Sequence, residues 1–295
     1  MTHRLDADDL FIHRVQEECA RRRLNFFLIE PLWVAAFHEE LARGRVWARV
    51  LLNMHSEHHQ PEEPYHRLVR LAAQQNTRVI DHPDTARAAC DKESLHPRLM
   101  WWGIHVPYTL FVQAKEIGRF RLTEEHRRAL GSSFVIKPAL GYGRQGVILD
   151  AVREEDLLRS YAAWPDGSYL LQQRIIPQRY GQRPAYFRVF YVFGSVWTCW
   201  WDCETHHYQL ASPADGYDLR PVEEIARRIA ALTGMQFFSS EIAQTETGQL
   251  VAIDYVNDQC HLLSQGADPQ IGVPDGLVCS IADRLVEAAQ SMLRG

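Results

Sequence analysis

The most informative segment of the chain reads FVIKPALGYGRQGVILD, from Phe134 to Asp150. A β-branched, apolar run carries Lys137 and ends at Pro138, and a second apolar run follows a turn rich in glycine. The glycines of that turn are Gly141, Gly143 and Gly146. The pattern predicts a strand, a flexible turn and a second strand.

The turn contains the spacing G-x-G-x-x-G, but its context argues against a dinucleotide site. That motif needs a helix to begin at the last glycine, and here Val147 opens an apolar run instead. In a protein kinase the phosphate-binding lysine follows the glycine loop, whereas Lys137 precedes it. Two interpretations remain: an ordinary hairpin with a surface lysine, or a flap whose backbone N–H groups cover phosphates beside that lysine.

Composition narrows the class of protein. The 295 residues suffice for one elaborate domain or for two to three small ones. The net charge of -5 gives no basic field that would recruit nucleic acid or an anionic membrane. Only three of the 32 basic residues are lysines, so a retained lysine suggests a site that needs a compact ammonium rather than a guanidinium.

Neither the cysteines nor the chain start indicates secretion. The six cysteines form no C-x-x-C pair, and the first residues contain no apolar signal core. No apolar run approaches the roughly 20 residues of a membrane helix. We therefore expect a cytoplasmic protein that binds neither nucleic acid nor membrane.

The first hundred residues alternate between helical and strand patterns, which predicts a parallel α/β layer. The expected helices cover residues 9–23, 33–43, 65–75 and 83–102, and the expected strands cover 25–30, 46–52 and 77–81. The histidines at 55, 58 and 59 fall in a polar, proline-bearing stretch that is typical of a solvated loop rather than a metal site.

Beyond residue 110 paired strands replace this alternation. Strands are expected at 168–177, 186–194 and 195–201, followed by a hairpin of strands 237–244 and 249–257, and helices at 124–130, 154–164, 222–232 and 277–293. The fold class is therefore α/β, with α+β character in the C-terminal half. We predict an N-terminal α/β domain at 1–110, a small nucleotide-covering lobe at 111–177 and a C-terminal lobe at 178–295.

The last hairpin brings hard oxygen ligands together. Glu241 and Asp254 lie on its two arms, and Asn257 lies just beyond. Two carboxylates and an amide oxygen form the type of site that Mg²⁺ takes while it keeps other positions for phosphates and water. Acids at hairpin ends are also commonly solvated, so the pattern gains weight only in combination with the lysine and glycine turn upstream.

These motifs occur in the order found in the ATP-grasp enzymes, and residues 53–257 resemble that family. The segment V135-I-K-P and its three glycines resemble the phosphate-covering loop. Residues 171–175, LQQRI, resemble the strand that connects the two lobes and meets adenine. Residues 187–190, FRVF, resemble the family's arginine strand, and Glu241, Gly248 and Asp254 fall where its metal-binding hairpin would fall.

The resemblance implies a role for each matched residue. Lys92 and Lys137 would neutralise the phosphates of ATP, and Gly141, Gly143 and Gly146 would let the flap close over them. Gln172 and Gln173 would lie at the adenine. Arg188 would hold the transferring phosphoryl group, and Glu241, Asp254 and Asn257 would bind Mg²⁺, with Mn²⁺ as an alternative.

Two positions depart from the family pattern. The second metal-binding acid usually precedes the asparagine by two residues, but here Asp254 lies three before Asn257 and Tyr255 takes the expected place. A one-residue bulge would bring both side chains to one metal ion; otherwise one of them is not a ligand. Gln172 and Gln173 stand where a glutamate is common, which leaves the adenine to backbone groups.

The implied activity is ATP-dependent joining of a carboxylate, activated as an acyl phosphate, to an amine of an amino acid or peptide. The residues Asp202, Glu204, His206 and His207 could line the acceptor pocket or form a solvated turn. Cys203 and Cys260 have no activating motif and are not expected to be nucleophiles. A kinase on the same scaffold and a non-catalytic nucleotide-binding protein stay open as alternatives, as does a homodimer.

Overall fold

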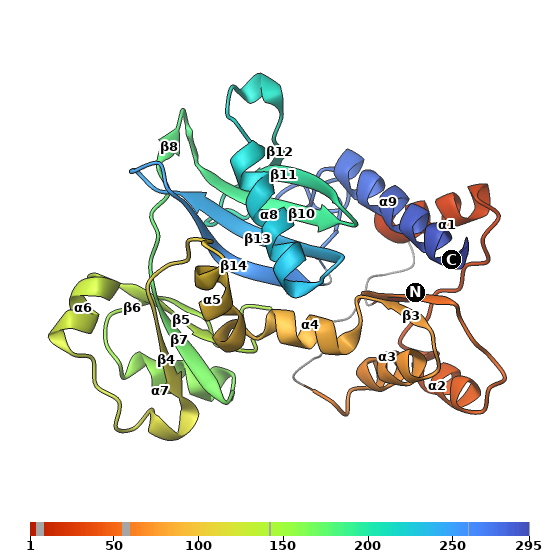
Figure 1. Ribbon diagram of the computed structural model, residues 1–295, viewed down its shortest axis with the longest axis horizontal. Coiled ribbons are helices and arrows are strands. Elements are labelled where there is room, and N and C mark those ends of the chain that lie inside the picture. Colours follow the sequence, from red (N-terminus) through yellow and green to blue (C-terminus); the bar gives the residue numbers. More distant parts are fainter. Residues whose placement is uncertain (4–8, 55–59, 142, 259, 295) are drawn as a thin grey trace.

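Three main sheets, with helices around them, form the computed structural model, which describes residues 1–3, 9–54, 60–141, 143–258 and 260–294 (Figure 1). One sheet is parallel and belongs to the N-terminal region; the other two are antiparallel. The α/β class with antiparallel sheets in the later part of the chain is confirmed.

The N-terminal sheet is parallel, in the order β1-β2-β3. Its strands are β1 (Thr2–His3), β2 (Val50–Met54) and β3 (Arg78–Ile80). The helices of this region are α1 (Leu10–Arg21), α2 (Val34–Ala42), α3 (Pro64–Gln74) and α4 (Pro83–Cys90). Helix α3 is strongly amphipathic and buries Leu68 and Val69 in a cluster beside this sheet.

The strand predicted at residues 25–30 is wrong. Within that range only Ile29 makes a bridge, to Thr2, and its N–H donates to the carbonyl of Met1 at 2.8 Å. The segment lies beside β1, which has only two residues, so a single bridge forms in place of a full ladder. The apolar residues of this range serve in packing instead, because Phe26 and Leu28 contact the buried cluster that contains Phe11 of α1.

The single helix predicted at residues 83–102 is two helices, α4 and α5 (Lys92–Trp101), that meet at Asp91. Asp91 has extended backbone angles, and its carboxylate accepts a hydrogen bond from the N–H of Glu93 at 3.1 Å. An aspartate that caps the following turn competes with helix continuation. The break places Lys92 at the beginning of α5.

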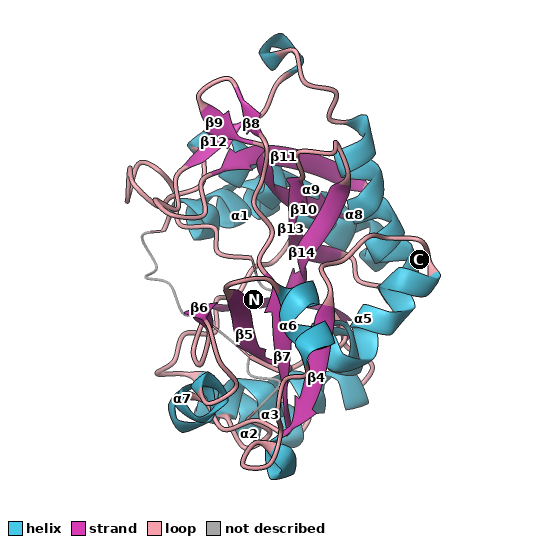
Figure 2. Ribbon diagram, turned by 90° about the vertical axis from the view of Figure 1, so that its left-hand side faces the viewer, coloured by secondary structure: helices cyan, strands magenta, loops and turns pink. Residues whose placement is uncertain are grey.

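The second sheet is antiparallel in the order β4-β7-β5-β6 (Figure 2). Its strands are β4 (Thr109–Gln113), β5 (Phe134–Pro138), β6 (Ile148–Ala151) and β7 (Ser168–Gln173), and the helices of this lobe are α6 (Glu124–Leu130) and α7 (Asp156–Ala163), with a 3₁₀ turn at Ala114–Glu116. The predicted strand 168–177 therefore ends at Gln173. Beyond it the chain crosses to the third sheet, where the N–H of Gln178 donates to the carbonyl of Gln244 at 2.8 Å.

The third sheet has five antiparallel strands in the order β12-β11-β10-β13-β14. They are β10 (Tyr186–Val192), β11 (Ser195–Trp201), β12 (Tyr208–Leu210), β13 (Phe237–Gln244) and β14 (Leu250–Asp258). Helix α8 (Arg220–Thr233) packs on this sheet through Val222 and Ala226. A short ribbon of β8 (Arg179–Tyr180) and β9 (Arg183–Pro184) and a 3₁₀ turn at Pro213–Asp215 complete this part.

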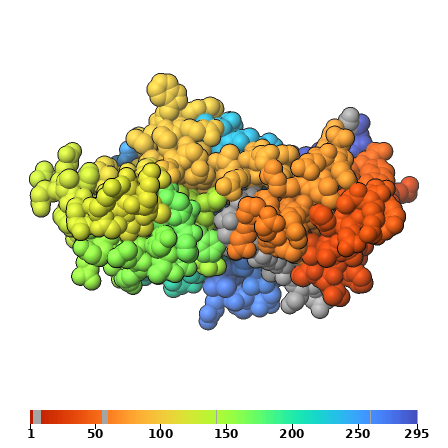
Figure 3. Space-filling model, turned by 90° about the horizontal axis from the view of Figure 1, so that it is seen from below, coloured from red at the N-terminus to blue at the C-terminus, as the bar shows by residue number. Residues whose placement is uncertain are grey.

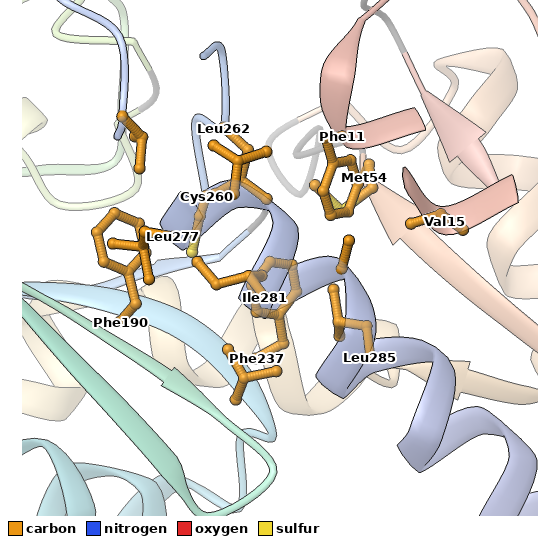
Figure 4. Packing of buried hydrophobic residues seen from close by; sticks show 14 of the residues in the cluster. Phe11, Val15, Met54, Phe190, Phe237, Cys260, Leu262, Leu277, Ile281 and Leu285 are labelled. Carbon is orange, nitrogen blue, oxygen red and sulfur yellow. The ribbon is translucent and has the colours of Figure 1, made fainter. Parts of the chain in front are cut away.

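Helix α9 (Asp275–Arg294), near the C-terminus, packs against α1 and against the third sheet. Its residues Leu277, Ile281 and Leu285 are buried among Phe11 of α1 and Phe237 of β13 (Figure 4). Burial of such side chains stabilises the fold by roughly 2 kcal/mol each.

The early and middle parts of the chain lie at opposite ends of the molecule (Figure 3). The division at residues 110 and 177 stays a prediction. No helix in the described ranges is long and apolar enough to span a membrane.

Candidate active site

A cavity of about 630 Å³ lies among the second sheet, the third sheet and the beginning of α5. It is lined by five basic and four acidic side chains of the described chain: Lys92, Lys137, Arg144, Arg174, Arg188, Glu204, Glu241, Asp254 and Asp258. Charges of both signs converge in a concave site that is large enough for a nucleotide. The structure thus brings most of the predicted site residues to one place.

Lys137 lies on β5 with its side chain directed toward β14. Its Nζ donates to the carbonyl of Ile253 at 3.2 Å. Burial lowers the pKa of Lys137, while Asp254 and Glu241 oppose that shift. Lys92 approaches from α5, with its Nζ 3.7 Å from Oδ1 of Asp254. The two lysines therefore lie on the same side of the cavity, close to one carboxylate.

The glycines of the predicted flap have different surroundings. Gly141 and Gly143 line the cavity, and Gly143 has a φ of +58°. Gly146 is instead packed against Trp164 and Pro138, and its carbonyl accepts a hydrogen bond from Ser160 at 2.5 Å. Gly146 thus anchors the end of the flap, and its contact with phosphate stays a prediction.

The hairpin of β13 and β14 contains a bulge between Asp254 and Asn257, one of the two alternatives that the sequence left open. Ser239 pairs with Asn257 and Glu241 pairs with Asp254, so three steps on β14 oppose two on β13. The extra residue puts Asp254 and Asn257 on the same face of the hairpin, and the Asn257 side chain helps to lower the pKa of the Asp254 carboxyl. Tyr255, which takes the family's usual acid position, is buried on the opposite side of the strand.

Glu241, Asp254 and Asn257 fit a divalent metal ion. Oδ1 of Asp254 is buried and accepts no hydrogen bond from the described residues, although Lys92 lies near it. Burial acts to raise the pKa of Asp254, but Lys92, Lys137 and Arg188 hold it below its ordinary value, so the carboxylate is charged. Among the described residues no three His, Cys, Asp or Glu side chains cluster, so an amide would have to supply the third protein ligand.

Arg188 and Glu241 form the best-defined ion pair of the site. They are directly opposite each other on β10 and β13, and Nη1 of Arg188 lies 2.5 Å from Oε1 of Glu241. Only 11% and 14% of their side-chain surfaces are exposed. The guanidinium is therefore fixed beside the carboxylates, where a phosphoryl group would gain from its planar donors.

Gln172 and Gln173 both line the cavity, but the Gln172 side chain hydrogen-bonds to residues of two other strands. Its Nε2 donates to the hydroxyl groups of Thr109 and Tyr255, at 3.4 Å and 3.3 Å. The Tyr255 hydroxyl lies 2.5 Å from Nδ1 of His96 on α5. A buried polar network thus occupies the far side of the strand that carries Asp254, and Nε2 of Gln172 belongs to it.

We expect His96 to make the protein acid-sensitive. Burial lowers the pKa of His96 to about 4, so unfolding takes up a proton between pH 6.5 and 4 and stability is lost as pH falls through that range. Between pH 7.5 and 5.0 the unfolding free energy should drop by roughly 2 kcal/mol more in the wild type than in His96→Phe, given about 1.4 kcal/mol per pKa unit. Urea titrations at the two pH values measure this; parallel losses in both proteins would contradict it.

A contact across the cavity involves Arg144 and Trp201, which the sequence patterns did not identify. Arg144, on the flap, lies over the ring of Trp201 at 5.7 Å and has Nη1 2.5 Å from Nε2 of His206. Trp201 ends β11, and His206 belongs to the turn that follows. The flap is therefore in contact with the third sheet. In the sequence, the only signal for this contact is the positive charge of Arg144 within the glycine-rich turn.

The turn after β11 was expected either to line the acceptor pocket or to be solvated, and its residues divide between these two roles. Glu204 and His206 line the cavity, whereas the Asp202 carboxylate accepts hydrogen bonds from backbone N–H groups of the turn. Burial raises the pKa of Cys203, and that of Cys260 to about 12, so neither thiol is activated. Histidines 55, 58 and 59 lie outside the described residues.

The comparisons with known proteins agree with this geometry. No protein-family model and no curated protein matches the sequence. Among solved structures, a RimK domain ATP-grasp protein from Sphaerobacter thermophilus is 18% identical, with a TM-score of 0.64 and 97% of both chains covered. D-alanine–D-alanine ligase from Bacillus anthracis, complexed with ATP, is 13% identical, with a TM-score of 0.65, 100% of this chain and 96% of that chain.

A third similar structure is the ATP-grasp ligase PsnB, complexed with a minimal precursor, Mg and ADP. It is 14% identical, with a TM-score of 0.62, and covers 97% of this chain and 98% of its own. All three matches extend over nearly the whole chain. The protein has the ATP-grasp fold.

Proposed function

We propose that the protein is an ATP-dependent ligase that joins a carboxylate to an amine, the amine belonging to an amino acid or a peptide. The observation that carries the proposal is the meeting of two lysines, one arginine and the bulged Glu241–Asp254 hairpin in one cavity. The similar structures support it, since those compared include ligases described with ATP, or with Mg and ADP.

The proposed reaction has two displacements. An oxygen of the substrate carboxylate attacks the γ-phosphorus of ATP, and the bond to the ADP oxygen breaks. The amine nitrogen then attacks the acyl carbon, phosphate leaves, and the nitrogen loses a proton. Such chemistry needs charge neutralisation, alignment and exclusion of water rather than a covalent protein nucleophile.

Six of the charged residues that line the cavity have a part in this proposal. Lys92 and Lys137 bind the phosphates, and Arg188 holds the phosphoryl group as it transfers. Glu241, Asp254 and Asn257 hold Mg²⁺ or Mn²⁺, which when bound neutralises phosphate charge. Gly141 and Gly143 allow the flap to approach the nucleotide closely, and the contact of Arg144 with Trp201 keeps the flap over the cavity.

The test is product analysis with Mg²⁺-ATP and a panel of amino acids, short peptides and simple carboxylates. We expect ADP and free phosphate in equal amounts, and a product whose mass equals both substrates less one water. ADP with a phosphorylated product and no free phosphate would identify a kinase. Nucleotide binding without any ADP release would leave a non-catalytic binding protein. Asp254→Asn is the matched inactive control.

A further inference from the structure

Tyr186 lies two residues before Arg188 on β10, and its side chain is on the same face of the sheet. Glu241 is the direct partner of Arg188 in the ladder, so Tyr186 reaches it diagonally. The Tyr186 hydroxyl donates to Oε2 of Glu241 at 2.9 Å, while Nη1 of Arg188 donates to Oε1 at 2.5 Å. Each oxygen of this carboxylate therefore has its own donor.

The tyrosine is held firmly in this position. It is 6% exposed, and its ring packs against that of Trp201 with centroids 5.4 Å apart. A buried ring has no room to turn its hydroxyl toward water, so the hydrogen bond to Glu241 is its natural alternative. Each carboxylate oxygen still has a second lone pair, which leaves Glu241 able to bind a cation.

We propose that Tyr186 is a positioning residue for the divalent metal ion, acting through Glu241. The inference rests on the proposed function, because it takes Glu241 to be a metal ligand. Arg188 alone would hold one oxygen and let the carboxylate rotate about that contact. The second donor fixes the plane of the carboxylate, and a neutral hydroxyl does so without adding positive charge beside the metal.

The two donors also differ in what they can do during the reaction. Arg188 lines the cavity and is the residue expected to contact the transferring phosphoryl group. When its guanidinium shares its hydrogen bonds with that group, its grip on Glu241 weakens. Tyr186 has no other hydrogen-bond partner among the described residues, so it keeps Glu241 aligned throughout.

The experiment measures Mn²⁺ binding to the protein–ADP complex from the electron paramagnetic resonance signal of free Mn²⁺, so it needs no acceptor substrate. Removal of an outer-shell partner typically weakens metal binding 10- to 100-fold. We expect Tyr186→Phe to weaken Mn²⁺ binding about 10-fold and Glu241→Gln at least that much. The matched control is Tyr217→Phe, which removes a 2.9 Å hydroxyl hydrogen bond to Gln244, on the same sheet but outside the cavity lining.

A second measurement separates positioning from general damage to the fold. The affinity for ADP without metal should stay within about 2-fold of wild type in Tyr186→Phe, and a loss there would overturn the inference. Wild-type Mn²⁺ binding by Tyr186→Phe together with weak binding by Glu241→Gln would overturn the role of Tyr186 and leave the metal site intact. Wild-type binding by both variants would remove the metal site and the inference together.

Discussion

Replacing Lys137 with alanine is expected to lower ATP turnover by about 10²- to 10³-fold, the range seen when one preorganised donor is removed from a transition state. Lys137 is partly buried, and its Nζ donates a hydrogen bond to the carbonyl of Ile253. A charge held in this way needs little reorganisation when phosphate charge develops beside it. Steady-state ADP release with the accepted substrates gives the measurement.

Two further variants show whether the lower turnover of Lys137→Ala comes from the lost charge or from damaged packing. Lys137→Met keeps most of the apolar stem without the charge and should lose nearly as much activity. If the loss in Lys137→Ala came from packing damage alone, Lys137→Met would stay active. Lys115→Ala changes another of the three lysines, one that is exposed on the same lobe, and should have wild-type turnover. Wild-type activity in Lys137→Met would show that the ammonium takes no part in phosphoryl transfer.

The sequence was sufficient for the main features of the site because they depend on local spacing. The hairpin pattern placed Glu241 and Asp254 on facing arms of neighbouring strands, and the structure pairs them directly. The three-residue separation of Asp254 and Asn257 suggested a bulge as one of two alternatives, and the ladder has one there. Tyr255 showed the limit of matching by position, since its ring belongs to a buried network with His96.

Features set by long-range packing could not be read in the same way. Asp91 ends one helix and caps the next, although the surrounding residues are compatible with one continuous helix. Residues 25–30 have the composition of a strand, but β1, beside which Ile29 lies, has only two residues and supports a single bridge. Tyr186 could have been suspected from its two-residue spacing to Arg188, yet only coordinates show which oxygen its hydroxyl reaches.

The second and third glycines of the flap, Gly143 and Gly146, predict different stabilities for the same substitution. Both have positive φ, +58° at Gly143 and +71° at Gly146, so alanine at either position costs about 1 kcal/mol of backbone strain. A Cβ at Gly143 would meet no described atom within 4 Å. At Gly146 it would lie 2.7 Å from Cβ of Trp164 and 2.9 Å from Cγ of Pro138. Neither atom can move aside by a side-chain rotation, because Cβ of Trp164 is fixed by the backbone and Cγ of Pro138 by its ring.

Gly146→Ala is therefore expected to lower the unfolding free energy by about 3 kcal/mol, since overpacking adds roughly 1–3 kcal/mol to the strain. Gly143→Ala should lose about 1 kcal/mol. Urea unfolding of both variants without nucleotide isolates this effect from ATP binding. The displaced chain at Gly146 would also strain the hydrogen bond from Ser160 that anchors the flap, so ATP affinity should fall with stability. Equal losses in the two variants would mean that Gly146 is only a flexible turn residue and does not anchor the flap.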